Sequence, residues 1–184
     1  ICRLMMDKFP RLRKLTINTT GLTPHRAIPM LTQVVKDANE RGIIFSTRVS
    51  IDGVGDMHNA VRNVKRGFDK ANETITAMKA LQKDYAFNFG ISTTIFSQNL
   101  DDAENILAWA KRENLDIVFN MVRVTDAMLG NNDVADKIRP MGEEEKRMRQ
   151  FFLDRVRMDP LLDGQNYIYM QYADMIANGY HRTA

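Results

Sequence analysis

The stretch Arg48-Val-Ser-Ile-Asp-Gly53 decides the fold, because it ends a strand-like segment in a polar turn. The whole segment, Ile44–Asp52, alternates apolar and polar side chains, which is typical of a β-strand with one buried face. Three further segments alternate in the same way and are rich in β-branched or aromatic residues: Arg13–Thr19, Ala86–Phe96 and Asp116–Arg123. The sequence therefore predicts four strands.

Segments of helical period lie between and after these strands. The predicted helices cover Ile28–Arg41, Gly67–Lys83, Leu100–Glu113, Glu143–Met158 and Gln165–Ala177. In the first of them, Pro29 is expected in the first turn, where proline is tolerated. In the third, Asn99 is the expected N-cap and Asp102 the acidic residue of the first turn. Strands that alternate with helices indicate βαβ units and a parallel sheet, so the predicted fold class is α/β.

The other side of each strand carries small or polar side chains. These are Thr16, Asn18 and Thr20, then Ser46, Arg48, Ser50 and Asp52, then Asn88, Gly90, Ser92 and Thr94, and finally Asp116, Val118, Asn120 and Val122. Strands of a doubly wound sheet are apolar on both faces, because helices cover both. Here the polar face either meets water or lines the lumen of a β/α barrel whose helices all cover the apolar face. The alternation of all four strands with helices favours the barrel.

Ligands of parallel β/α sheets bind at the carboxyl ends of the strands. Here those ends are Asn18–Gly21, Ser50–Gly53, Thr93–Thr94 and Asn120–Arg123, and all of them are polar. A polar lumen with polar strand ends predicts a site for a polar ligand.

Several motifs resemble the sequences of radical S-adenosylmethionine (radical SAM) enzymes. Arg48–Gly53 resembles the hydrophobic-Ser-hydrophobic-Asp-Gly run on the fourth strand of that family. His58-Asn59, Arg62 and Gly67-Phe-Asp resemble the turn and the helix start that follow this strand in the family. Weaker resemblances to the third, fifth and sixth strands lie in Leu15–Gly21, with Thr20 where Asn is commoner, in Ser92–Ile95 with Asn99, and in Phe119–Arg123.

The resemblance implies a partial (β/α)6 TIM-like barrel, of which this chain carries about the last four parallel strands and their helices. Its barrel core, with strands three to six, is expected at 1–142, and a C-terminal helical segment at 143–184 leads to further sequence. The family's Cys-x3-Cys-x2-Cys loop and Gly-Gly-Glu-Pro run are not in this sequence, in which Cys2 is the single cysteine. Both would precede Ile1, so the chain is expected to be a piece of a longer polypeptide.

The resemblance also implies a chemistry. In the family, a [4Fe–4S] cluster takes one electron from a donor such as flavodoxin or ferredoxin and reductively cleaves SAM, and the 5′-deoxyadenosyl radical abstracts hydrogen from a substrate. This chain would supply the ribose, adenine and carboxylate side of the SAM pocket, without ligands to the metal. The residues implied are Ser50, Asp52, Arg62, Thr19, Thr20, Thr93, Thr94, Asn99, Asn120 and Arg123. The substrate is not identified, and the chain alone is expected to be inactive.

The strongest of these residues also have structural interpretations. The Ser50 hydroxyl can bond a neighbouring strand, and the Asp52 carboxylate can either accept from the ribose hydroxyls or organise the turn at Gly53. Arg62 can pair with the methionine carboxylate of SAM, which suits a guanidinium fork, or form a salt bridge with Asp52 or Asp56. These alternatives stay open at the level of sequence.

The remaining residues carry similar alternatives. Asn99 can be a plain helix cap, Arg123 can be an exposed residue without a ligand, and His58 is expected to fix its turn rather than to catalyse. For the whole chain, the alternatives are a non-catalytic SAM-fold binding or scaffold domain and a different TIM-barrel enzyme. The latter would need a catalytic Lys or a carboxylate pair at strand ends and a Gly-rich phosphate loop, and the sequence offers neither.

The composition of the sequence limits the classes of partner that are expected for the chain. Hydrophobic residues make up 44% and charged residues 27% of the sequence, which is ordinary for a globular protein. The formal net charge is +3 and the basic residues are scattered, so nucleic-acid binding is not expected. The sequence has no run of about 18 apolar residues, so no membrane span is expected. A single cysteine rules out a disulfide within the chain and fits the reducing cytoplasm.

Overall fold

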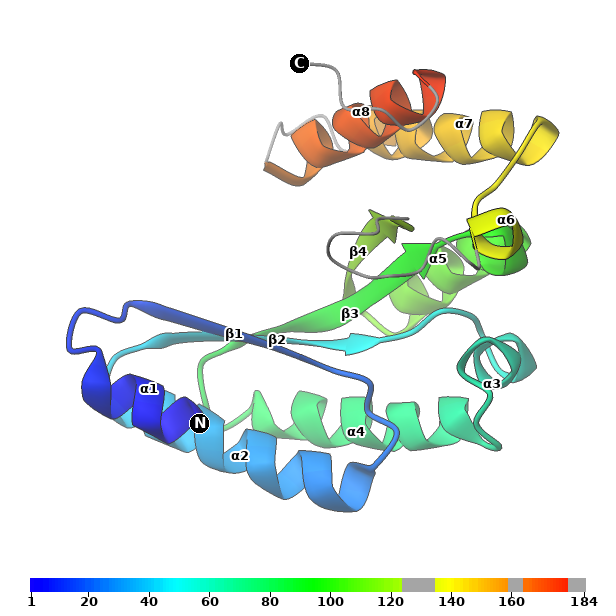
Figure 1. The fold of residues 1–184 in the computed structure, drawn as a ribbon. Helices are drawn as coiled ribbons and strands as arrows, with labels where there is room; N and C mark the ends of the chain where they lie inside the picture. The colour runs from blue at the N-terminus through cyan, green and yellow to red at the C-terminus, as the bar shows by residue number, and fades with distance from the viewer. Residues whose placement is uncertain (124–134, 159–163, 179–184) are drawn as a thin grey trace. The chain divides into compact units, whose positions relative to one another are not determined.

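The computed structural model describes residues 1–123, 135–158 and 164–178, and the chain forms two compact units (Figure 1). The first unit consists of Ile1–Thr93 and Asp102–Val118, and the second of Thr94–Asp101 and Phe119–Ala184. The first unit contains most of the sheet together with the helices that cover it. The second contains the C-terminal helices.

The sheet has four parallel strands in the order β1-β2-β3-β4. The strands are β1 (Lys14–Thr19), β2 (Ile44–Ser50), β3 (Asn88–Ile95) and β4 (Asp116–Met121). β1 pairs with β2 from Lys14↔Ile44 to Thr19↔Val49, and β2 pairs with β3 from Ser46↔Asn88 to Ser50↔Ser92. The four predicted strands, the parallel sheet and the α/β class are confirmed. Among the described residues the sheet is open, with β1 and β4 as its edges, which is compatible with part of a β/α barrel.

Two helices cover one face of the sheet in the first unit. The helices of this unit are α1 (Cys2–Lys8), α2 (Pro24–Glu40), α3 (Asp56–Arg62), α4 (Gly67–Leu81) and α5 (Ala103–Arg112). Helices α2 and α4 lie on the same side of β1, β2 and β3 and pack against β2 and each other (Figure 1). The apolar side chains beneath them are buried: Leu15, Phe45, Val49, Ile51, Phe89 and Ile91. The polar side chains of the opposite face are exposed or half-buried: Thr16, Asn18, Ser46, Arg48, Ser50, Asn88 and Ser92.

The start of α2 differs from the prediction. The helix begins at Pro24, with Thr23 as N-cap, so that Pro29 lies inside the helix and not in its first turn. Pro24 takes the first helical position, where a missing backbone N–H costs nothing because that group has no partner within the helix. Pro29 is exposed, so the carbonyl group that loses its helical donor lies near solvent.

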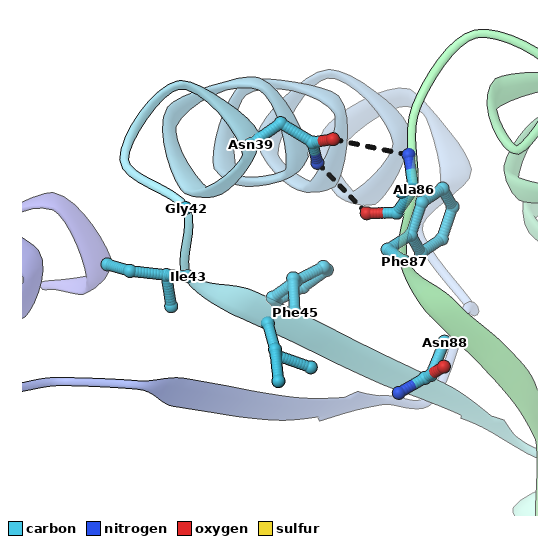
Figure 2. Close-up of a pocket in the computed structure, with 8 residues that line it drawn as sticks. Asn39, Gly42, Ile43, Phe45, Ala86, Phe87 and Asn88 are labelled. Atoms are coloured by element: carbon cyan, nitrogen blue, oxygen red, sulfur yellow. Dashed lines mark hydrogen bonds between the residues drawn. The ribbon is translucent and has the colours of Figure 1, made fainter.

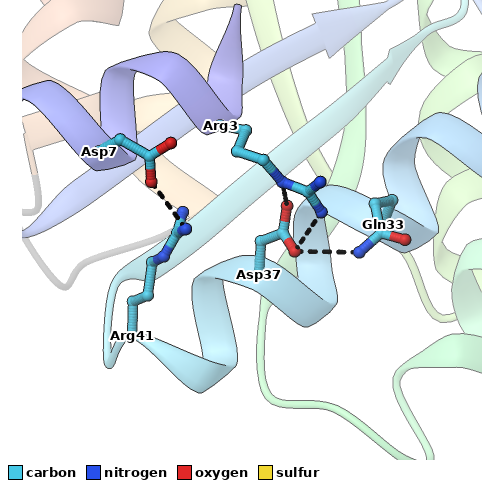
Figure 3. A network of polar contacts seen from close by, with 5 residues as sticks. All are labelled: Arg3, Asp7, Gln33, Asp37 and Arg41. Carbon is cyan, nitrogen blue, oxygen red and sulfur yellow. Dashed lines mark hydrogen bonds and ion pairs between the residues drawn. The ribbon is translucent and has the colours of Figure 1, made fainter.

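A polar network joins α1 to α2 (Figure 3). The Nε and Nη2 of Arg3 each donate to the Asp37 carboxylate at 2.9 Å, and the Gln33 amide donates to it at 2.9 Å. A second pair joins Arg41 to Asp7 at 2.8 Å. The hydrogen bonds from Arg3 hold the pKa of the Asp37 carboxyl below its ordinary value. The ionised carboxylate therefore stabilises the docked α1 at neutral pH, and this contribution is lost as the pH falls through the lowered pKa.

Substitution of Thr47 by Val is expected to raise the free energy of unfolding by about 1 kcal/mol. Thr47 is fully buried on the apolar face of β2, and its Oγ1 has no hydrogen-bond partner among the described residues. Valine keeps the shape and removes the unpaired hydroxyl. Thr74 is the matched control, since it is also fully buried but donates to the Gly21 carbonyl at 3.1 Å, and Thr74→Val should destabilise. The midpoints of urea unfolding measure the stability of both variants. Equal losses of stability in Thr47→Val and Thr74→Val would contradict the expectation.

The second unit is built on an aromatic cluster. Its helices are η1 (Ser97–Asp102, all but its last residue), α6 (Ala135–Ile138), α7 (Glu143–Met158) and α8 (Gly164–Ala177). The rings of Phe119, Phe151, Phe152, Tyr169 and Tyr172 form a chain of contacts with centroids 4.9–5.7 Å apart. The two predicted C-terminal helices are confirmed as α7 and α8, with α8 beginning one residue early. None of the helices in the described ranges is long and apolar enough to cross a membrane.

Candidate functional site

The loop that follows β2 is fastened to β3 through Ile51. The Ile51 N–H donates to the Ser92 carbonyl at 2.9 Å, which continues the strand pairing. The Ile51 carbonyl accepts the Thr93 hydroxyl at 2.6 Å, and the Thr93 side chain is fully buried. Both polar groups of the Ile51 backbone are therefore held by β3 at the point where the polar loop begins.

The next residues of the loop are fastened to helices. The Asp52 N–H donates to Nδ1 of His58 in α3 at 3.1 Å. The Val54 N–H donates to the carboxylate of Asp102, directly before α5, at 2.7 Å. Gly53 lies between them, and a Cβ there would come within 2.5 Å of Cγ of Met57. The loop is thus packed onto α3 so closely that only glycine fits.

An ion pair at the carboxyl end of β2 joins Asp52 of the Arg48–Gly53 motif to Arg62 of α3. Nη2 of Arg62 lies 2.5 Å from Oδ2 of Asp52, and the side chains are 27% and 7% exposed. Of the two salt bridges that the sequence allows for Arg62, the structure has the one with Asp52. Asp56 instead accepts a hydrogen bond from Asn59 at 3.2 Å. Nε of Arg62 is buried and has no hydrogen-bond partner among the residues described.

His58 is fully buried beside this pair. Its ring contacts Phe68 of α4 edge to face, with centroids 6.1 Å apart, and Phe68 contacts Trp109 of α5 at 5.3 Å. Burial lowers the pKa of the imidazole, with the nearby Asp52 acting in the opposite direction and Arg62 in the same one. The expectation that His58 fixes its turn is confirmed by the hydrogen bond from the Asp52 N–H.

The polar face of the sheet carries Ser50 at the carboxyl end and Arg48 in the middle. Ser50 is half-buried and lies beside Ser92 in the register, and its hydroxyl makes no hydrogen bond within the described ranges. Arg48 lies beside Gly90 and donates to Oδ2 of Asp116 at 2.6 Å and to the Ile91 carbonyl at 3.1 Å. The alternative in which Ser50 bonds a neighbouring strand is therefore not realised.

The other implied residues are distributed between the two units. In the first unit, the half-buried Thr19 accepts the Gly21 N–H at 3.2 Å, Thr20 is exposed, and Thr93 holds the Ile51 carbonyl. Thr94, Asn99, Asn120 and Arg123 belong to the second unit, where Thr94 and Arg123 are exposed and Asn120 is half-buried. The structure thus brings Ser50, Asp52 and Arg62 to one strand end of one unit.

Asn99 is not the N-cap of the helix that follows it. Its Oδ1 accepts the Phe96 N–H at 2.9 Å and its Nδ2 donates to the Thr94 carbonyl at 2.9 Å. These bonds hold the backbone directly before η1. Because η1 occupies Ser97–Asp102, α5 begins only at Ala103, three residues later than predicted. Asn99 is fully buried and bonds the backbone of the preceding residues, so the alternative in which it is a plain helix cap is not realised.

Sequence reasoning missed two contributors to the site, Asp102 and Gly90. Asp102 looks like an ordinary first-turn carboxylate, yet it accepts an N–H from a loop 48 residues away. Gly90 looks like a weak point in a strand, yet it leaves room for Arg48. The signal for Gly90 is its place on the polar parity, where an isolated strand glycine indicates a close approach of other groups.

A pocket of about 310 Å³ lies at the opposite, amino ends of β2 and β3 (Figure 2). Asn39 at its rim donates to the Ala86 carbonyl at 3.0 Å and accepts the Ala86 N–H at 3.2 Å. Ile43, Phe45 and Phe87 supply apolar lining. Because the Asn39 amide is already satisfied and functional groups of β/α proteins gather at the other end, the candidate site is not placed at this pocket.

No family model matches the chain. No curated protein matches it either. Among the described residues, no group of three or more His, Cys, Asp or Glu side chains is placed to hold a metal ion.

Proposed function

We propose that this chain is the SAM-binding part of a radical SAM enzyme. The observation that carries the proposal is the Asp52–Arg62 pair, set beside an uncommitted Ser50 hydroxyl at the carboxyl end of β2. This is the strand end at which the Arg48–Gly53 motif resembles the family, and strand ends are where ligands of parallel β/α sheets bind. The four-stranded parallel sheet is compatible with the partial barrel of that family.

The charges at this strand end suit the zwitterionic methionine part of SAM. Arg62 uses Nη2 on Asp52, while its Nε is a buried donor without a partner in the described part of the chain. A carboxylate that accepts from this Nε would satisfy it, and a planar guanidinium can serve both carboxylates at once. The Ser50 hydroxyl is available to the ribose or to the same carboxylate. Thr94, Asn99, Asn120 and Arg123 lie in the second unit, and the resemblance alone implies them for the ribose, the adenine or the substrate.

The residues of this chain do not fit a [4Fe–4S] cluster. Cys2 is the single cysteine of the sequence and lies in α1. A cluster needs several thiolates, so its ligands and the contact with flavodoxin or ferredoxin would come from residues outside this sequence. In the proposed parent enzyme, which would work in the cytoplasm, the cluster and SAM together supply the radical. This chain contributes binding and orientation.

Binding of SAM tests the proposal directly. Calorimetric titration of the chain with SAM should give saturable binding, and Ser50→Ala should weaken it about five- to tenfold, the size of one lost hydrogen bond. Ser46→Ala is the matched control, because Ser46 is half-buried on the same face of the same strand but lies toward the amino end. Equal losses in the two variants, or no binding by the wild type, would overturn the proposal.

Titration of the parent protein with SAM, together with its iron content, separates the alternatives. SAM binding by a parent protein that contains no iron would indicate a non-catalytic binding or scaffold domain that keeps the fold. Absence of SAM binding would leave a different TIM-barrel enzyme as the better interpretation of the polar strand ends.

A further inference from the structure

We infer that His58 is the positioning residue of this site: its neutral imidazole accepts the Asp52 N–H and thereby fixes the backbone from which the Asp52 carboxylate holds Arg62. The inference deepens the proposed function and rests on it only for its ligand-binding consequence. In the proposed function His58 acts on the ligand only through Asp52 and Arg62.

The hydrogen bond assigns the protonation of the ring. A backbone N–H can only donate, so Nδ1, at 3.1 Å from the Asp52 nitrogen, must be the unprotonated acceptor. The proton of the neutral ring therefore lies on Nε2, which is buried and has no hydrogen-bond partner in the described ranges. Holding an unpaired donor in a fully buried position costs free energy. Packing alone gives no reason to keep such a group, whereas the Nδ1 acceptor does.

A charged imidazole is incompatible with this arrangement. Protonation would put an N–H on Nδ1, facing the N–H of Asp52. Burial lowers the pKa of the ring and so favours its neutral form. The conflict between the two N–H groups favours the neutral form as well. The charged groups that act on the ring are Asp52 and Arg62 themselves, and Phe68 covers it from α4.

The position of Arg62 depends on this bond through Asp52. Asp52 is the only residue of its loop that both accepts from Arg62 with its side chain and donates to His58 with its backbone. Its side chain is 7% exposed, so the carboxylate has little freedom to move once the backbone is fixed. Loss of the acceptor at Nδ1 frees the Asp52 peptide, and the direction in which the Arg62 Nε points is then no longer fixed.

Three variants distinguish this role from packing. Asn at position 58 places a side-chain oxygen near the position of Nδ1, Gln places its oxygen near that of Nε2, and Leu fills space without any acceptor. The full chain is labelled with ¹⁵N, and the Arg62 Nε–H resonance is assigned by its loss in Arg62→Lys. The resonance should keep its position and slow exchange in His58→Asn, and should shift and exchange faster in His58→Gln and His58→Leu.

The ring itself gives a second measurement that needs no variant. The ¹⁵N shifts of the wild-type imidazole should show an unprotonated Nδ1 and a protonated Nε2 at neutral pH. A proton on Nδ1, or an Arg62 Nε–H resonance that is unchanged in a folded His58→Leu chain, would overturn the inference. SAM titration adds the functional arm, in which His58→Leu should bind about tenfold more weakly and His58→Asn nearly as well as the wild type. If the wild type does not bind SAM, the proposed function fails, while the two NMR measurements still decide the role of His58.

Discussion

Substitution of Gly90 by Ala should destabilise the chain by about 2–3 kcal/mol, the cost of a group forced into a packed site. Gly90 lies on β3 beside Arg48 of β2, and the Arg48 guanidinium crosses the polar face of the sheet to Asp116. A Cβ at position 90 would collide with the Asp116 carbonyl oxygen and lie 2.9 Å from Nη1 of Arg48. The carbonyl belongs to the backbone of β4, so the strands must move apart to relieve the contact.

Chemical denaturation measures this effect, and two further variants interpret it. Gly164→Ala is the control, since a Cβ at position 164 meets nothing within 4 Å and should leave stability nearly unchanged. Adding Arg48→Ala to Gly90→Ala removes the flexible partner but not the backbone oxygen. Little recovery of stability is therefore expected in the double variant. A near-neutral Gly90→Ala, or full recovery by Arg48→Ala, would show that the approach of β4 to Gly90 is not limiting.

The sheet could be predicted from the sequence because the alternation of apolar and polar residues is local and recurs in every strand. Each strand alternates in period two, and helices cover only one face, so parity alone separates buried Phe45 and Val49 from half-buried Ser46 and Ser50. Thr47 follows the same rule: its parity places it inside although its chemistry does not. Hydrophobic periodicity thus predicted the faces better than residue type would have done.

The first residues of the helices were harder to predict from the sequence, because several local signals compete at each of them. Thr23-Pro24 and the later Pro29 both suit a helix beginning, and the helix takes the earlier. Asn99 is a good N-cap by type, yet its side chain closes the entry to a 3-10 turn instead. Asp102 then contributes to the site through a residue 48 positions away. No pattern confined to a helix and its flanks carries such information.

The residues of the candidate site could be predicted from the sequence, but their geometry could not. The motif placed Ser50, Asp52 and Arg62 at one strand end, and it left open whether Arg62 would pair with Asp52 or Asp56. The choice depends on the path of the loop, which Gly53 allows to pass directly over Met57, and on the bond from Asp52 to His58. Both are tertiary features, and they fix which atoms of Arg62 remain available.

Substitution of Arg62 by Met should lower the free energy of unfolding by about 2 kcal/mol and, under the proposed function, abolish most SAM binding. The stability loss arises because the Asp52 carboxylate, 7% exposed, would be left without its cation. Breaking a fully buried pair costs more, roughly 3–5 kcal/mol, but Arg62 is 27% exposed and solvent reduces the effect. Thermal and urea unfolding measure the first loss, and calorimetric titration with SAM measures the second.

The double variant Asp52→Asn with Arg62→Met separates the two losses. A neutral amide at position 52 has no unpaired charge, so stability should return to near the wild-type value, whereas SAM binding should stay weak because the guanidinium is still missing. Arg66→Met is the matched control in the neighbouring turn: Arg66 pairs with Asp69, and both side chains are largely exposed. It should change neither stability nor binding measurably. Recovery of SAM binding together with stability in the double variant would show that Arg62 serves the fold alone, and it would remove the guanidinium from the proposed SAM pocket.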